Sequence, residues 1–301
     1  MKVTFWGVRG SIPSPGMMTA GVGGNTSCVS VETDDGTLII FDAGTGIRQL
    51  GVELMKHGFG RGGREGHIFF SHTHWDHIQG FPFFMPAFIG AKDEQQRRIP
   101  DRTNTFYLYG AKKVFERLEN TLRGQMEYQY FPIGLDSMGA NIHFHELQES
   151  PLRIGGNSII PQHLNHPNGV LSYRLECGES SRKIVAYATD TEHYRDGELD
   201  VNVLKIAENA DVFIYDAMYT PQEYDGNPEN NPLFFKAPRY GWGHSTWLEG
   251  TRLAKAANVK ELVLFHHDPE HSDEFLREIE RQAQQEFPRT RLAVEGLEIL
   301  L

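Results

Sequence analysis

The chain has 301 residues, which is enough for one large α/β domain or two small ones, and its hydrophobic fraction of 39% can fill a substantial core. A formal net charge of −11 argues against a surface that grips long nucleic acid, since such surfaces usually carry a basic excess. Its two cysteines, Cys28 and Cys177, have no metal-binding or redox spacing, which argues against a disulfide-stapled secreted fold. No window approaches about 18 consecutive apolar residues, and no signal peptide is evident at the start. We therefore expect a cytoplasmic protein without a membrane span.

The first third of the chain contains short apolar or alternating runs that predict β-strands. Turn residues bound each run, and Thr33-Asp-Asp-Gly36 is typical of a hairpin turn. A helical pattern begins near Ile47 and stops at Gly58. The strands predicted here cover residues 3–8, 28–32, 37–41 and 67–70, and the helix covers residues 47–57.

Residues 81–132 form an excursion rich in phenylalanine, proline and charge, with a strand-like stretch at 105–109 and a helix candidate at 111–123. The second half repeats the strand theme and then alternates helix and strand. Its predicted strands are 141–147, 158–164, 170–176, 183–188, 211–215, 261–265 and 291–294, the last closing the chain, and its predicted helices are 201–208, 246–257 and 273–285. Strand clusters in each half, with helices outside them, predict an α/β fold of two packed sheets flanked by helices, in one domain spanning residues 1–301.

The densest group of metal-competent side chains comes directly after the predicted strand at 67–70. His72 and His74 are two residues apart, and Asp76 and His77 follow within one tight turn. Buried without a metal, these groups would leave unpaired polar atoms that each cost on the order of a few kcal/mol. Imidazole and carboxylate ligands together suit zinc or another first-row divalent ion, and the lack of cysteine argues against a closed structural zinc site.

The segment His72-Thr-His-Trp-Asp-His77 resembles the signature of the metallo-β-lactamase superfamily. Within that superfamily, Gly243-His-Ser-Thr246 and the alanine-rich helix after it resemble the tRNA 3′-processing endonucleases (tRNase Z) and related phosphodiesterases. Further segments are similar to the remaining motifs in the same chain order: Phe41-Asp-Ala-Gly-Thr-Gly46, Leu164-Asn-His166, Thr189-Asp190 and Leu264-Phe-His266. The resemblance implies a four-layer αββα sandwich of two mixed sheets, with metals at one edge between the sheets.

The resemblance also implies two divalent metal ions per chain, for which we expect zinc, with manganese or iron as the other candidates. One ion would be bound by His72, His74 and His166. The other would be bound by Asp76, His77 and His266, with Asp190 bridging both. His267 is an alternative to His266 that the sequence leaves open. Asp42 would accept a hydrogen bond that fixes one histidine tautomer. A hydroxide held between the ions would be the nucleophile, so no serine or cysteine nucleophile is needed.

Besides Asp76 at the metals, two further residues are catalytic candidates. His244 stands before Ser245-Thr246, which could merely start a helix, but the resemblance favours a general acid that protonates the departing alcohol oxygen. Asp216 ends a predicted strand and could orient His244. The remaining histidines are expected to play no chemical part. His143 and His145 alternate onto one face of a strand, where we expect them to be solvated. No sequence partner implies chemistry for His57, His67, His163, His193 and His271.

We therefore predict a phosphodiester hydrolase that acts on a small substrate, such as a cyclic nucleotide or short nucleotide. The resembling tRNA-processing enzymes commonly carry a protruding arm between the third histidine ligand and the bridging aspartate. Here His166 and Asp190 are only 24 residues apart, so that arm is missing. A surface that tracks phosphates would also need positive charge. The alternatives left open are a tRNA 3′-processing endoribonuclease, a lactone, thioester or β-lactam hydrolase of the same fold, and a metal-dependent redox or binding role.

The excursion at 81–132 is expected to shape the active-site cleft. Its aromatic residues could stack on a base or pack into the core, and its basic residues could add modest phosphate affinity. These candidates are Phe83, Phe84 and Phe88, and Lys112, Lys113 and Arg123. The sequence leaves the oligomeric state open, a homodimer included.

Overall fold

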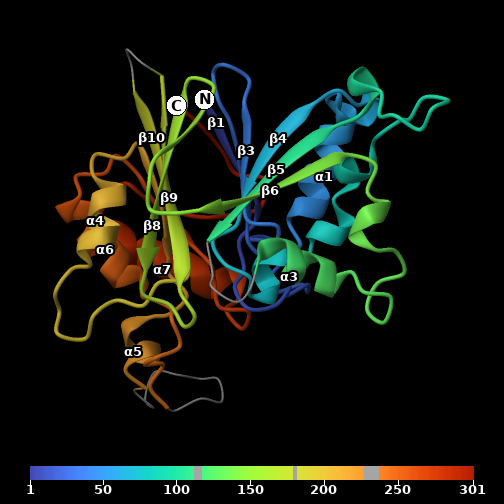
Figure 1. Ribbon diagram of the computed structural model, residues 1–301. Helices are drawn as coiled ribbons and strands as arrows, with labels where there is room; N and C mark the ends of the chain where they lie inside the picture. Colours follow the sequence, from blue (N-terminus) through green and yellow to red (C-terminus); the bar gives the residue numbers. More distant parts are fainter. Residues whose placement is uncertain (112–116, 179–181, 227–236) are drawn as a thin grey trace.

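A computed structural model describes residues 1–111, 117–178, 182–226 and 237–301. These residues form two seven-stranded sheets that face each other (Figure 1). The first sheet has the order β14-β1-β2-β3-β4-β5-β6, and the second has the order β13-β12-β11-β10-β9-β8-β7. The strands of the first sheet are β1 Lys2–Gly7, β2 Cys28–Glu32, β3 Leu38–Phe41, β4 Glu65–Phe69, β5 Thr105–Ala111, β6 Asn141–Leu147 and β14 Glu298–Leu300. Those of the second are β7 Leu152–Ile154, β8 Asn157–Leu164, β9 Val170–Cys177, β10 Lys183–Ala188, β11 Val212–Asp216, β12 Leu262–Phe265 and β13 Thr290–Leu292.

Both sheets are mixed, and each changes from antiparallel to parallel pairing where helical segments begin to connect its strands. β1, β2 and β3 pair antiparallel, whereas β3 to β6 pair parallel. In the second sheet β7 to β10 pair antiparallel and β10 to β13 pair parallel. Parallel neighbours need a crossover connection, which helices supply here. The helices are α1 Ile47–Lys56, α2 Trp75–Ile78, α3 Leu118–Gln125, α4 Val201–Ala207, α5 Pro221–Tyr224, α6 Trp247–Ala256 and α7 Asp273–Glu286. Single 3₁₀ turns lie at Phe59–Arg61, Phe81–Phe83, Met85–Phe88, Pro100–Arg102 and Leu135–Ser137.

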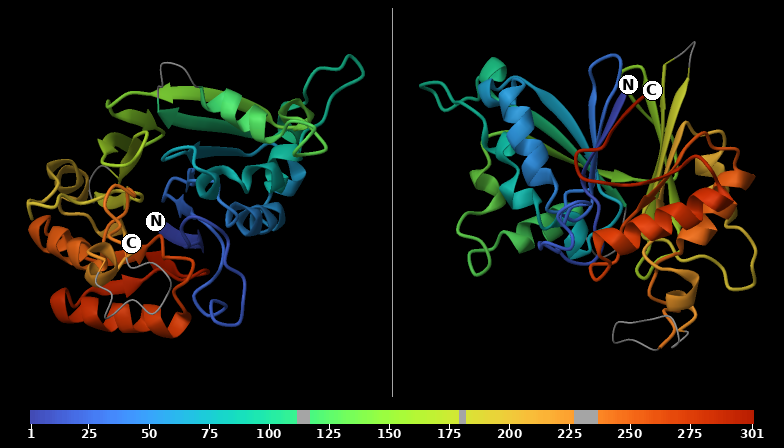
Figure 2. Two further views of the ribbon diagram at one scale, coloured as in Figure 1. Left: turned by 90° about the horizontal axis from the view of Figure 1, so that it is seen from below. Right: turned by 180° about the vertical axis from the view of Figure 1, so that it is seen from behind.

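Two large apolar clusters form most of the core, one between the sheets that continues beneath the helices of the second sheet, and one outside the first sheet. Between the sheets, Phe41 stacks on Tyr173 and Tyr187, with ring centroids 5.6 and 5.1 Å apart. Outside the first sheet, α1 and α3 bury a second apolar cluster that includes Ile47 and Leu122. The helices α4, α6 and α7 cover the outer face of the second sheet (Figure 2). This confirms the predicted α/β sandwich of two mixed sheets flanked by helices.

Three details of the predicted elements are corrected. Residues 141–147, which we grouped with the second-half strands, form β6 and pair with β5 in the first sheet. The chain does not close with the strand at 291–294, because β14 returns to pair with β1. The helix predicted at 111–123 is seen as α3 from Leu118, while residues 112–116, with Lys112 and Lys113, lie outside the described residues. Both β7 and β14 are three residues long, too short for an alternating pattern to reveal them.

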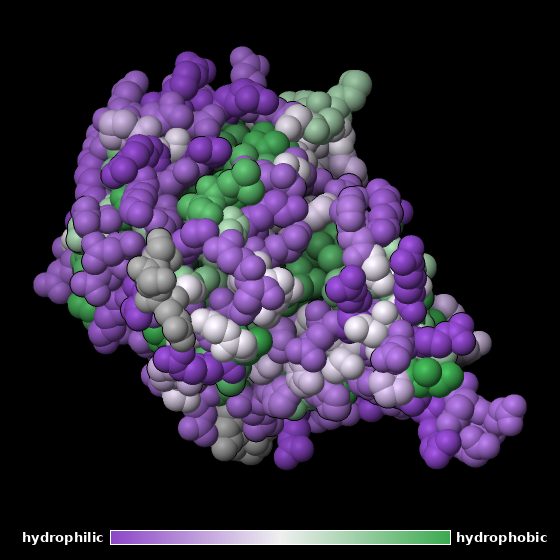
Figure 3. Space-filling view, turned by 90° about the horizontal axis from the view of Figure 1, so that it is seen from above, coloured by the Kyte–Doolittle hydropathy of each residue, from purple (hydrophilic) through white to green (hydrophobic). Residues whose placement is uncertain are grey.

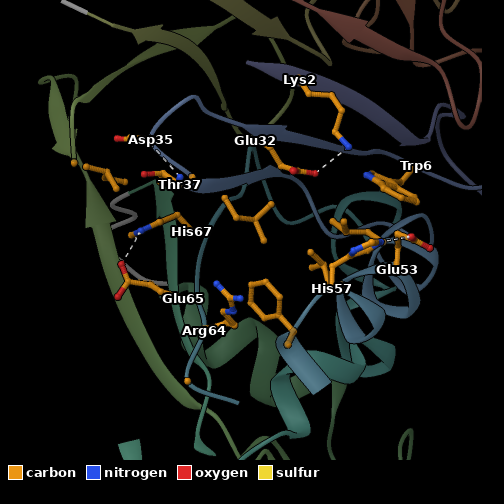
Figure 4. A pocket seen from close by; sticks show the side chains of 18 of the residues that line it. Lys2, Trp6, Glu32, Asp35, Thr37, Glu53, His57, Arg64, Glu65 and His67 are labelled. Atoms are coloured by element: carbon orange, nitrogen blue, oxygen red, sulfur yellow. Dashed lines mark hydrogen bonds and ion pairs between the residues drawn. The ribbon is translucent and has the colours of Figure 1, made fainter. Parts of the chain in front are cut away.

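The carboxyl ends of β3, β4 and β10 point to one end of the sandwich, where the predicted site residues follow them. The opposite end, where both termini lie (Figure 1), holds a separate cleft of about 840 Å³. Polar contacts line that cleft, among them the Lys2–Glu32 ion pair and the contact between His67 and Glu65, at 3.2 Å each (Figure 4). Seen from this end, the surface is mainly hydrophilic, with apolar side chains showing in patches (Figure 3). None of the predicted site residues lines this cleft.

Among the helices in the described ranges, none is both long and apolar enough to span a membrane.

Candidate metal centre

The loop after β4 brings four predicted ligands to the end of the sandwich. His74 is the N-cap of the single-turn helix α2, with extended backbone angles, and that turn places Asp76 and His77 on the buried side. His72, Asp76 and His77 are buried, whereas His74 is exposed. One strand end and one helical turn therefore present four metal-competent side chains in six residues.

Three loops of the second sheet complete the cluster, and Asp190 lies at its centre. His166 follows β8, Asp190 follows β10 and His266 follows β12. Their ligand atoms form two groups whose members lie within 4.8 Å of one another: His72, His74, His166 and Asp190, and Asp76, His77, Asp190 and His266. The structure thus brings together all seven residues that the sequence suggested as ligands.

The two carboxylate oxygens of Asp190 are divided between these groups. Oδ2 lies 3.6 Å from Nε2 of His72, and Oδ1 lies 3.2 Å from Nε2 of both His77 and His266. On the second side, Nε2 of His266 also lies 3.1 Å from Oδ2 of Asp76. A carboxylate with one oxygen toward each group has the geometry of a bridging ligand.

Backbone geometry explains how these side chains leave their strands toward the site. Asp42, Asp190 and His266 have φ values of 60°, 52° and 61°, in the left-handed region that non-glycine residues seldom adopt. Each follows directly, or after one residue, on the end of a strand. Such conformations cost about 1–3 kcal/mol each and concentrate at functional sites, where the surrounding structure holds them in place.

Asp42 holds the cluster from behind through four hydrogen bonds. Its Oδ2 accepts from Nδ1 of His77 at 2.8 Å, from Ser71 Oγ at 2.8 Å and from Tyr187 Oη at 2.7 Å, while Oδ1 accepts from the Ser71 amide at 2.7 Å. Because a carboxylate only accepts, Nδ1 of His77 must carry the proton, and its Nε2 is directed at the cluster. In the same way, Nδ1 of His166 donates to the carbonyl of Gly243 at 2.8 Å. These outer partners fix the ring orientation of both histidines.

The charges in the cluster are strongly coupled. Burial works against the charged form, but the carboxylates of Asp190, Asp76 and Asp42 hold the pKa of His77 well above its usual value. Burial, together with the neighbouring His77, holds the pKa of His72 well below it. Against the effect of burial, the surrounding histidines keep the pKa of Asp190 well below that of a free carboxyl group. The cluster therefore combines ionised carboxylates with a neutral imidazole whose lone pair is available.

His266, not His267, belongs to the cluster. Nε2 of His267 donates to the carbonyl of Ala293 at 3.0 Å, and His267 belongs to none of the groups of possible ligands among the described residues. Gly10 makes room for His266, because a Cβ atom at that position would lie 2.5 Å from its ring.

His244 and Asp216 form a pair beside the second group. Nδ1 of His244 lies 2.9 Å from Oδ2 of Asp216, and its ring stacks on His266 with centroids 5.0 Å apart. Burial lowers the pKa of His244, but the carboxylates of Asp216, Asp190 and Asp76 outweigh it and raise the pKa to about 9. Thr246 does cap α6 by accepting from the Glu249 amide. The Gly243–Thr246 segment is therefore both a helix start and part of the site.

The other histidines have structural surroundings. His143 and His145 are exposed on β6 as expected, and they also stack on Tyr107 and Tyr109. His271 precedes the Ser272 cap of α7, and its Nε2 pairs with buried Glu223 at 2.8 Å.

Sequence reasoning missed residues that hold the site loops in place. Arg9 is fully buried and donates to three carbonyls, those of Gly23, Asp268 and His271. Two residues on, the Ser11 amide donates to Oδ2 of Asp76 at 2.8 Å. A lone arginine between strands carries no recognisable sequence signal.

Glu192 is a second missed residue, and it acts on the loop that carries His244. Its two oxygens accept from the amides of Gly241 and Gly243, at 2.8 Å each. Behind that loop, Nδ1 of His193 lies 2.9 Å from Ser245 Oγ. The position of Glu192, two residues after Asp190, was the one available hint.

Two open clefts adjoin the cluster, and they share Ser11 and His244. The first, of about 390 Å³, is lined by Ser11, Thr73, His74, Trp75, Asp76, Asp190 and His244. The second, of about 370 Å³, is lined by Ser11, Met218, Tyr219, Arg239, Gly241, Trp242, His244, Asp268, Pro269 and Glu270.

The excursion at 81–132 contributes to neither lining among the residues that the structure describes. Phe84 is buried in the outer core, Phe88 packs against it, and Phe83 is exposed beside Phe131. Arg123 pairs with Glu119 and Asp136 at 2.9 Å each. Four of its residues instead surround a small cavity beside His72: Gly110, Ala111, Leu118 and Thr121. A role for the excursion in shaping the cleft stays a prediction.

Comparison with known protein families assigns the chain to a superfamily. Residues 37–267 match the family model of the beta-lactamase superfamily domain, a span that runs from the residue before β3 to His267. The chain belongs to this superfamily.

Related superfamily members resemble the chain over its full length. A ribonuclease Z from Gemmatimonas aurantiaca is 24% identical over 328 residues, covering 100% of this chain and 96% of the relative. A solved diphosphatase from the PhnP family has a TM-score of 0.65 at 17% identity, covering 100% of this chain and 97% of the other. Human tRNase Z, short form, has a TM-score of 0.63 at 20% identity, covering 100% and 99%. At these identities the solved structures show the shared metallo-β-lactamase fold.

The residues of this superfamily member fit divalent metal ions. Nε2 of His72 is buried without a hydrogen-bond partner among the described residues and lies beside Oδ2 of Asp190. Nε2 of His77 and Nε2 of His266 face each other at 3.2 Å, where two imidazoles can share only one proton. Converging lone pairs of this kind are satisfied by a cation, and a set of imidazole and carboxylate donors suits first-row divalent ions. The chain is thus a hydrolase-type member of the superfamily with a candidate metal centre.

Proposed function

We propose that this chain is a dinuclear metal-dependent phosphodiesterase acting on a small phosphodiester, such as a cyclic nucleotide or a short nucleotide. The observation that carries the proposal is the division of the Asp190 oxygens between two histidine groups, with the His244–Asp216 pair beside them. Two-metal sites are typical of enzymes that cleave phosphate esters.

The first ion would be held by His72, His74 and His166. The second would be held by Asp76, His77 and His266. Asp190 would contact both. When bound, the ions supply Lewis acidity and lower the pKa of water so that a nucleophile forms near neutral pH. Zinc fits the donor set best, because it accepts imidazole and carboxylate ligands in flexible geometry, and manganese or iron are the other candidates.

His244 would act as the general acid. Its Nδ1 is engaged by Asp216, so Nε2 is the nitrogen that can give a proton to the departing oxygen. It lines both clefts, where an ester spanning the centre would reach it. Positioned proton transfer of this kind contributes about 10²–10⁴-fold to rate.

The site favours a small substrate on three grounds. β9 and β10 pair directly between His166 and Asp190, so the described residues there form a hairpin with no protruding arm. The net charge of −11 opposes binding of a long polyanion. Clefts of about 390 and 370 Å³ are in the range of small-ligand pockets, about 300–1,000 Å³.

A tRNA 3′-processing endoribonuclease is the second candidate, favoured by the full-length similarity to the Gemmatimonas aurantiaca ribonuclease Z. Side-by-side assays with bis(p-nitrophenyl) phosphate, cyclic nucleotides, dinucleotides and a tRNA precursor with a 3′ trailer separate the two. Turnover of the small diesters supports our proposal. Specific removal of the trailer at low enzyme concentration, without turnover of the small diesters, would contradict it. A parallel lactone and thioester panel tests the remaining hydrolase alternative.

A further inference from the structure

Trp242 stands at the edge of the site on a loop that is held from both sides. It is 47% exposed and lies between Gly241 and Gly243, which both have positive φ. The carboxylate of Glu192 is largely buried and accepts from the amides on either side of the tryptophan. Gly243 also accepts from the predicted ligand His166. The backbone that carries the indole is therefore held in place relative to the predicted ligand His166.

The cleft beside Trp242 has the composition of a site for a flat, uncharged group. Met218, Tyr219 and Pro269 supply apolar walls, and the guanidinium of Arg239 lies 4.8 Å from the Trp242 ring and 5.5 Å from the Tyr219 ring. Asp268 and Glu270 line the same cleft. Their charge would repel a phosphate, but it suits the N–H groups of a heterocycle. A mainly apolar wall with few polar groups is typical of small-molecule sites.

The position of His244 indicates which part of a substrate this cleft would hold. His244 and Ser11 are shared with the neighbouring cleft, which contains the predicted ligands His74, Asp76 and Asp190. A phosphoryl group at the metal ligands would lie in that first cleft. The general acid would then stand between the phosphorus and whatever occupies the Trp242 cleft.

We propose that the Trp242 cleft is a subsite for the leaving group and binds a planar nucleobase on the alcohol that departs. This assignment rests on the proposed phosphodiesterase function, and it narrows the substrate class to esters of a nucleoside alcohol. Glu192 is then a positioning residue that keeps the indole in place. Base stacking on an aromatic side chain is worth about 1–3 kcal/mol, so removal of the ring should weaken binding about fivefold or more.

Product-like inhibitors test the assignment in the metal-loaded full-length protein. Adenosine probes the proposed subsite, ribose lacks the base, and inorganic phosphate probes the metal centre. With bis(p-nitrophenyl) phosphate as the substrate, Trp242→Ala should raise the Ki of adenosine about fivefold or more, while the Ki of phosphate changes less than about twofold. Trp242→Phe should restore most of the affinity, and adenosine and phosphate should bind together in double-inhibition plots. Glu192→Gln should weaken adenosine binding in the same direction.

Trp75→Ala is the matched control, because Trp75 is 80% exposed in the other cleft. It should leave the Ki of adenosine unchanged. Equal losses for adenosine and phosphate in Trp242→Ala, equal inhibition by ribose and adenosine, or a larger effect of Trp75→Ala would overturn the proposal. If wild type hydrolyses no diester, the proposed function fails by itself. Because the chain has four tryptophans, the loss of adenosine-induced fluorescence quenching in Trp242→Phe relative to wild type then decides whether Trp242 binds a base.

Discussion

His244 donates from Nδ1 to Oδ2 of Asp216 across 2.9 Å, at the point where β11 leaves the second sheet. The same carboxylate accepts from the Thr191 amide through Oδ2 and from the Met218 amide through Oδ1, so its position does not depend on the histidine. A carboxylate held in this way can stabilise the imidazolium form of His244 and direct its Nε2 at the cleft.

Asp216→Asn should shift the alkaline limb of the pH–rate profile to lower pH. The general acid must be protonated to act, so activity is lost as the pH rises through the pKa of His244. Among the carboxylates that raise this pKa, Asp216 has the largest effect, and asparagine keeps the shape of its side chain without the charge. The measurement is kcat/KM against pH on a diester with an alkoxide leaving group. An unchanged alkaline limb would show that Asp216 does not set the protonation of His244.

His244→Ala should retain metal binding but lower kcat by about 10²-fold or more on substrates with poor leaving groups. A nitrophenolate leaves without protonation, so bis(p-nitrophenyl) phosphate should be much less affected. Comparing the two substrate types in one variant separates proton donation from a general disturbance. Equal losses on both would argue against the general-acid role.

His266→Gln and His267→Gln form a matched pair at adjacent positions. Nε2 of His266 faces Asp76, His77 and Asp190, whereas His267 donates to a backbone carbonyl, and burial together with Arg9 lowers the pKa of His267 to about 3. His266→Gln should weaken the binding of one metal ion about 100-fold or more, since even outer partners cost about 10–100-fold. His267→Gln should keep two ions per chain. Metal analysis after dialysis against a weak chelator measures both.

The sequence was sufficient to predict the parts of the fold and site that depend on local patterns. Apolar or alternating runs predicted most of the strands. The four ligand-type side chains between His72 and His77 indicated a metal centre before the ligands from other parts of the chain were known. The pairing of β6 with β5 and the pairing of β14 with β1 could not be predicted. A strand of only three residues, such as β14, or a strand at the edge of a sheet, such as β6, does not specify its neighbour. Arg9 and Glu192 were missed for a similar reason: the groups they hold in the site loops are backbone carbonyls and amides, which leave no pattern in the side chains.

Asp190→Ala should abolish activity while leaving the fold largely intact. Asp190 is the residue that belongs to both ligand groups, so its loss removes one contact from each ion. We expect fewer than two ions per chain by elemental analysis and an unchanged far-ultraviolet circular dichroism spectrum. Near-normal turnover with two ions bound would show that the ligand assignment is wrong.

Metal affinity should fall steeply as the pH is lowered through the neutral range. In the metal-free protein, Asp190, Asp76 and Asp42 overcome the effect of burial and hold the pKa of His77 well above its usual value, so this imidazole carries a proton at neutral pH. A ligand nitrogen must lose its proton to bind a metal, and binding therefore releases protons. Each fall in pH below the pKa of His77 therefore favours the protonated, metal-free form, and each rise toward it favours the loaded form. Zinc titration calorimetry at pH 6 and pH 8, in buffers of different ionisation enthalpy, measures the affinity and the proton release.

Asp42→Asn removes the outer carboxylate and lowers the pKa of His77, so it should reduce the proton release at neutral pH. If the metal affinity did not depend on pH and no protons were released, His77 would not lose a proton when the metal binds, and the prediction would be wrong.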